Sequence, residues 1–188
     1  MAQKSGKEVK NTRFGRGRYN TDYAPDENGE FHYIGSHYMV DLEPKKMRAL
    51  RIRLIVLSLL ALAAFLAGGT SNGVTGRTVY ALIPFICCML PVGYLLMGLC
   101  SWLMRKEKKL TRKGMDETLN RMRNSAVGMI CTAAIALAGG IVACVVHKAF
   151  AEEILFLLSA AALMALGILI RLTIRAIPLR EIRRGEKE

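Results

Sequence analysis

Four long apolar runs divide the cations of this chain into two very unequal groups, and this division limits the possible folds more than any other feature. The runs cover residues 50–68, 79–104, 125–146 and 154–174. Twenty-five of the 27 Lys and Arg residues lie within residues 1–53, 105–123 and 171–188. The other two, Arg77 and Lys148, lie in the loops that follow the first and third runs. At ~1.5 Å of rise per residue, each run can cross a hydrocarbon core about 30 Å thick.

This alternation predicts an all-α integral membrane protein with four transmembrane helices. Because positively charged loops stay on the side where the chain is made, both ends are expected in the cytoplasm. The two cation-poor loops are short, which predicts two antiparallel helical hairpins, one from the first two spans and one from the last two. We expect a multi-pass protein of the cell membrane, and its compactness favours a bacterial plasma membrane.

The remaining sequence divides into soluble parts around the transmembrane domain, which we place at residues 48–176. A basic segment covers residues 1–47, a connector covers residues 105–124 and a basic tail covers residues 177–188. The formal charge of +12 is also typical of nucleic-acid-binding proteins. In a four-span protein, topology and attraction to anionic lipid at the cytoplasmic face explain this charge better, so lipid and not nucleic acid is the expected partner.

The N-terminal segment contains two short aromatic-rich runs on either side of Gly35-Ser36. This pair suits a type II′ turn, and the pattern favours a short β-hairpin over residues 31–40. A lone hairpin is only marginally stable in water, so membrane-facing loops, a second copy or a partner must cover it. Interleaved aromatic side chains are typical of docking surfaces. We therefore interpret Phe31, Tyr33 and Tyr38 as candidates for partner docking.

The connector carries a second candidate docking surface. Met115, Leu119 and Met122 are spaced i, i+4 and i+7, which places one apolar stripe on a basic segment. The stripe fits a helix that lies at the membrane surface or binds a partner. It fits a solvated extension of the third span equally well, and the sequence does not separate the two.

Small residues in the last two spans predict close helix packing. They recur mostly every four residues, which places them along helix faces: Gly128, Thr132, Ala136, Gly140, Ala161 and Ala165. In lipid, close approach of backbones supplies much of the packing between helices. The simplest interpretation is a contact within the chain, between the third and fourth spans. Self-association and contact with another membrane protein are the alternatives.

The second span contains two prolines and a row of sulfur atoms. Pro84 and Pro91 are seven residues apart and predict a kink, because each removes a backbone donor. The freed carbonyls must be buried in protein or face a wet cavity. Met97, Cys100 and Met104 share one face, and such soft ligands suit Cu(I). Met and Cys are also flexible apolar fillers, which we favour, so no metal or other cofactor is predicted.

The absence of catalytic patterns narrows the function. The interiors of the apolar runs contain no ionisable Asp, Glu, Lys, Arg or His, which ion-coupled carriers usually need. No nucleotide-binding, metalloprotease or serine-hydrolase motif is present. We therefore expect a non-enzymatic accessory, scaffold or regulatory subunit that docks a partner through its cytoplasmic face. The alternative is a small transporter or homo-oligomeric pore whose kinked second helix lines the path.

Overall fold

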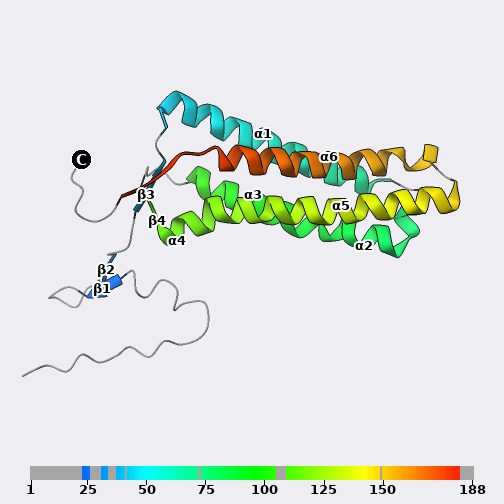
Figure 1. Ribbon diagram of the computed structural model, residues 1–188, viewed down its shortest axis with the longest axis horizontal. Coiled ribbons are helices and arrows are strands. Elements are labelled where there is room, and N and C mark those ends of the chain that lie inside the picture. The colour runs from blue at the N-terminus through cyan, green and yellow to red at the C-terminus, as the bar shows by residue number, and fades with distance from the viewer. Residues whose placement is uncertain are drawn as a thin grey trace, which may run out of the picture.

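The computed structural model describes residues 23–25, 31–33, 37–40, 42–71, 73–104, 109–148 and 150–182. Most of these residues are helical, and four long helical segments lie side by side in one elongated bundle (Figure 1). All four are long and apolar enough to cross a membrane: Pro44–Gly69, Val79–Met104, Lys113–His147 and Glu153–Arg175. The structure therefore confirms the coarser part of the prediction, namely four helices with the length and composition of membrane spans, as is typical of a multi-pass membrane protein.

Each span is built from one or more helical elements. The first is α1 (Pro44–Gly69), and the second consists of α2 (Val79–Cys87) and α3 (Met89–Met104). The third begins with α4 (Arg112–Met115) and the π-helical turn η4 (Asp116–Asn120) and continues as α5 (Arg121–His147). The fourth is α6 (Phe150–Arg175), and a short 3-10 helix, η3 (Val74–Arg77), precedes α2. The first and third spans thus begin earlier than their apolar runs, because helix formation continues into the basic flanks.

The break in the second span lies between its two prolines. The amide of Cys88 donates to the carbonyl of Phe85, three residues earlier, at 3.0 Å. Pro91 has no N–H to offer the carbonyl of Cys87, so the regular hydrogen-bond pattern cannot continue through this point. The second span is thus divided into α2 and α3 at Cys88, between the two prolines.

The helix α5 is central to the bundle, because it packs against α2, α3 and α6. The helix α1 lies mainly along α6, with a smaller contact to α3. Three aromatic rings join α1, α2 and α6: Phe65 stacks on Phe85 with 5.3 Å between centroids, and Phe85 contacts Phe156 at 4.9 Å. Aromatic pairs at these separations stabilise the contacts beyond the area that they bury.

Two small antiparallel sheets accompany the helices. In the first, β1 (Tyr23–Pro25) pairs with β2 (Phe31–Tyr33). In the second, β3 (His37–Val40) lies between β4 (Lys109–Thr111) and β5 (Leu179–Ile182). This three-stranded sheet joins a segment before the first span, the connector and the segment after the fourth span at one end of the bundle (Figure 1).

The expected hairpin over residues 31–40 is wrong, because its two strands belong to different sheets. The strand β2 pairs with β1, whereas β3 pairs with β4 and β5. A central strand has hydrogen-bonding partners on both sides, and Val40 at the end of β3 is buried in the core of the bundle. In an isolated two-stranded hairpin, β3 would have a hydrogen-bonding partner on one side only, and Val40 would lack the core that buries it.

Candidate functional site

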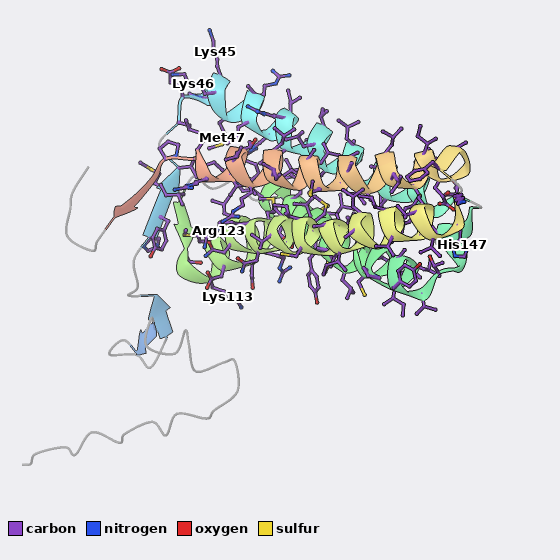
Figure 2. The ribbon with its side chains drawn as sticks, turned by 45° about the vertical axis from the view of Figure 1, so that its right-hand side comes forward. Lys45, Lys46, Met47, Lys113, Arg123 and His147 are labelled. Atoms are coloured by element: carbon purple, nitrogen blue, oxygen red, sulfur yellow. The ribbon has the colours of Figure 1, made fainter. Side chains whose placement is uncertain are left out.

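The charge division seen in the sequence becomes a division between the two ends of the bundle. Lys45, Lys46, Lys113 and Arg123 lie at the end that carries the three-stranded sheet, and His147 lies at the opposite end (Figure 2). We call the end with the three-stranded sheet the cation-rich end, and the end with His147 the far end. Among the described residues, most cations lie at the cation-rich end, so we expect sites for ligands and partners there.

The connector stripe is not an exposed docking surface. Met122 is fully buried and Leu119 is 2% exposed, while Met115 is half-buried. Met122 packs against Gly98 of α3, where a Cβ atom would lie 2.8 Å from its Cγ. The partner-docking interpretation of Leu119 and Met122 is therefore corrected: the stripe is an extension of the third span, and its apolar face is covered by the bundle itself.

Within the three-stranded sheet, β3 presents different residues on its two faces. Tyr38 and Val40 pack against the core of the bundle. Since side chains alternate along a strand, His37 and Met39 lie on the opposite face, and both are half-buried. Tyr38 therefore has a packing role, and the face of β3 that carries His37 and Met39 is the better candidate for docking.

The other two aromatic docking candidates belong to the smaller sheet. Phe31 pairs in register with Pro25, and Tyr33 pairs with Tyr23. These pairings place both residues on β2, outside the three-stranded sheet that contains Tyr38. The structure therefore separates residues that the sequence analysis had grouped in one hairpin.

The small residues of α5 contact two neighbouring helices. Gly128 lies against Pro91, and the hydroxyl of Thr132 is 3.2 Å from Sγ of Cys88. Gly140 lies instead against α6, at Phe156 and Leu157. These small residues of α5 therefore pack on the second span as well as on the fourth span. Only the contact with the fourth span was expected.

The other three members of the predicted packing set differ in burial. Ala136 is fully buried, Ala161 is half-buried and Ala165 is exposed. The expected packing role of Ala165 within the chain is thereby corrected. The close contact of α6 with α5 in this region comes from Gly167, which lies against Ala126, Met129 and Ile130.

The two prolines of the second span have different surroundings. Pro84 removes the usual donor to the carbonyl of Tyr80, and this carbonyl lies against α5 at Gly139, where a Cβ would be 2.8 Å away. Pro91 instead lines a hollow of about 570 Å³ between α3 and α5, together with Tyr94 and Asn124. Protein packing therefore covers the carbonyl freed by Pro84, whereas Pro91 borders open space.

The row of sulfur atoms faces outward from the bundle. Met97, Cys100 and Met104 are all exposed. Within the part of the chain that the structure describes, no three or more His, Cys, Asp or Glu side chains gather in a group that could hold a metal ion. Exposure of sulfur side chains on a membrane-spanning helix fits the role of apolar fillers in contact with lipid.

A buried carboxylate at the far end was not identified as a site residue from the sequence. Glu153, in the first turn of α6, is fully buried. Its Oε1 accepts a hydrogen bond from the backbone N–H of Thr75 at 2.7 Å, while its Oε2 has no partner. Gly73 leaves the space that the carboxylate occupies, since a Cβ there would overlap it. Thr75 and Glu153 are 78 positions apart in the sequence, so no local pattern predicts this contact.

No protein-family model matches the chain, and neither does any curated protein or solved structure.

Proposed function

We propose that this protein is a non-catalytic accessory, scaffold or regulatory subunit of a membrane, and that it docks another membrane protein through its cytoplasmic face. The observation that carries this proposal is the three-stranded sheet, in which β3, β4 and β5 come from three separate soluble segments. The sheet lies outside the helical scaffold, and surface segments positioned by a scaffold commonly carry function.

The proposed orientation places the cation-rich end in the cytoplasm, with both chain ends on that side. The support is the position of 25 of the 27 Lys and Arg residues in segments at this end of the spans, since cytoplasmic segments carry an excess of these residues. A bacterial plasma membrane is the proposed location. The sheet would then face the compartment that contains most cytoplasmic partners.

The proposed docking surface is the face of β3 that carries His37 and Met39, with the adjoining edges of the sheet. Among the described residues, no strand pairs with the outer edge of β4 or of β5. An unpaired edge can accept a strand from another chain through backbone hydrogen bonds. The combination of an open edge and a partly exposed Met side chain suits a protein partner.

The test is purification of the tagged protein from its native membranes in mild detergent, followed by native mass analysis of what accompanies it. The double variant His37→Ala/Met39→Gln should recover roughly fivefold less partner, because one lost contact of about 1 kcal/mol has this effect. Lys45→Gln is the control, since Lys45 is exposed at the same end but outside the sheet. Unchanged partner recovery by the double variant, at equal membrane levels, would contradict the proposal.

The alternative proposal is a small transporter or homo-oligomeric pore, and the observation in its favour is the hollow beside Pro91. A kinked helix next to a hollow of about 570 Å³, lined by both apolar and polar side chains, could form part of a path. This alternative expects solute flux in liposomes that contain only this protein, and loss of flux in the variant Pro84→Ala/Pro91→Ala. Purification as a homo-oligomer without a partner would favour it, and inert liposomes would count against it.

A further inference from the structure

A second cavity at the cation-rich end brings three arginines together. It has a volume of about 440 Å³ and lies between α5, α6 and the segment that leads into β5. Arg123 contributes from the start of α5, and Arg171 and Arg175 contribute from the last turns of α6. Two carboxamides also line the cavity, on Asn120 at the end of η4 and on Asn124 of α5.

The positive charge of this cavity is not balanced within the described part of the chain. No carboxylate there lies within 4.0 Å of any of the three guanidinium groups, and no described acidic residue lines the cavity. Like charges that share one cavity repel one another, and an anion bound between them would remove this repulsion. Guanidinium groups also bind phosphate through paired, charge-assisted hydrogen bonds. The cavity therefore has the chemistry of a phosphate site.

The rest of the lining indicates which phosphate compound fits. Val127, Ile174 and Ile177 add an apolar wall to the same cavity. Arg171 and Arg175 lie at the end of a membrane-spanning helix, the depth at which long cationic side chains reach lipid headgroups. A free phosphate ion would leave the apolar wall without a partner, whereas a phospholipid offers a phosphate and a hydrocarbon chain together.

We propose that this cavity binds one anionic phospholipid. Its phosphate lies among Arg123, Arg171 and Arg175, and the start of an acyl chain lies along the apolar wall. Basic pockets between transmembrane helices are a known form of lipid recognition. The sheet contributes Leu179 of β5 to the lining, but none of the three arginines belongs to the sheet. Variants at the arginines therefore test this cavity without changing the proposed docking face of β3.

The cations at the start of α1 provide a matched comparison. Lys45, Arg48 and Arg53 are exposed, as the three cavity arginines are, but they lie on a single helix and line neither of the two cavities described here. They attract anionic lipid only as a diffuse charge, which falls off within a Debye length. Removing three charges from this region changes the net charge of the protein as much as removing the three cavity arginines.

The experiment measures binding of phosphatidylglycerol to the purified full-length protein by native mass spectrometry in detergent. The variant Arg123→Gln/Arg171→Gln/Arg175→Gln should bind about tenfold more weakly than wild type, because it loses charge-assisted hydrogen bonds. The control Lys45→Gln/Arg48→Gln/Arg53→Gln should change binding less than about twofold. Equal losses in the two triple variants would overturn the proposal, since they would indicate diffuse attraction alone.

Two further measurements distinguish a phospholipid site from diffuse charge attraction and from a site for free phosphate. The variant Arg123→Lys/Arg171→Lys/Arg175→Lys keeps every charge but replaces the planar guanidinium groups, which bind phosphate through paired hydrogen bonds. It should therefore bind the lipid about threefold more weakly and remain folded. Unchanged affinity in this variant would count against bidentate recognition of the phosphate. Inorganic phosphate in millimolar excess should not displace the lipid, and complete displacement would show a site for free phosphate instead.

Discussion

The two ends of this bundle are built in opposite ways. At the far end, the N–H of Thr75 binds the buried Glu153, and Gly73 lets the loop lie directly on that carboxylate. At the cation-rich end, the three-stranded sheet overlies helix ends between which a basic cavity remains. The far end is closed by contacts within the chain, whereas the cation-rich end keeps space and unbalanced charge. We therefore expect the far end to contribute most of the stability and the cation-rich end to bind ligands and partners.

The largest effect is expected from breaking the buried contact at the far end. Glu153→Ala removes the acceptor of the Thr75 N–H and leaves this donor buried without a partner, which should lower the free energy of unfolding by about 3 kcal/mol. Unfolding by dodecyl sulfate in mixed micelles can be followed through the fluorescence of Trp102, the single tryptophan of the chain. The control Glu43→Ala removes a carboxylate whose side chain is 69% exposed and should cost less than about 0.5 kcal/mol.

Equal stability of the Glu153→Ala and Glu43→Ala variants would show that the buried contact at the far end contributes no more than a surface carboxylate. Glu153→Gln is a milder change, because its amide oxygen can still accept the hydrogen bond from the N–H of Thr75. We expect this variant to retain most of the lost stability, since a neutral acceptor of nearly the same shape replaces the carboxylate.

A smaller effect is expected where a glycine lets two backbones approach. Gly139→Ala places a methyl group 2.8 Å from the carbonyl oxygen of Tyr80, so α5 must move away from α2. The expected cost in the free energy of unfolding is about 2 kcal/mol, which is typical of overpacking. Gly93→Ala is the matched control: Gly93 lies in α3 with no heavy atom of a neighbouring segment within 4 Å of the added methyl group. It should be neutral or slightly stabilising, because alanine favours the helix.

The same unfolding assay separates these two glycine variants. A loss of stability in Gly93→Ala as large as that in Gly139→Ala would show that glycine is required for reasons other than backbone approach. Close approach of the two backbones would then not explain the stability of the contact between α2 and α5.

The sequence was sufficient for the membrane spans because the information is local. A run of about 20 apolar residues satisfies its own backbone as a helix and needs no distant partner to be recognised. The three-stranded sheet depends instead on pairings of His37 with Thr111 and with Ile182. Strands of three or four residues leave little pattern, and their register is set by segments far away in the chain. The N-terminal strands were therefore predicted near their correct positions but assigned to the wrong partners.

The candidate sites also depend on contacts between segments far apart in the chain, which the sequence does not reveal. The spacing of Met115, Leu119 and Met122 identified an apolar face, but only the structure shows that the bundle covers two of the three residues. The sequence also assigns Arg171 and Arg175 to one of the three cation-rich segments. Their convergence with Arg123 depends on the packing of α6 against α5, which no local spacing encodes.

The smallest effect is expected at a contact that holds α1 to α3 at the cation-rich end. The guanidinium carbon of Arg51 lies 5.6 Å from the centre of the ring of Trp102, which is 3% exposed. Arg51→Gln removes this cation–π contact and should lower the free energy of unfolding by about 0.5–1 kcal/mol. Arg53→Gln, at an exposed position two residues away, controls for the loss of a cation at the membrane surface.

The midpoint of the unfolding transition, and not the intensity, is the quantity to compare, because Arg51 also lies beside the fluorescent ring. If Arg51→Gln destabilised the protein as much as Glu153→Ala, the cation-rich end would contribute as much stability as the far end. The separation of stability from recognition would then fail. A small loss, with Arg53→Gln unchanged, would instead mean that this end is held by weak contacts and can leave its other cations available for ligands.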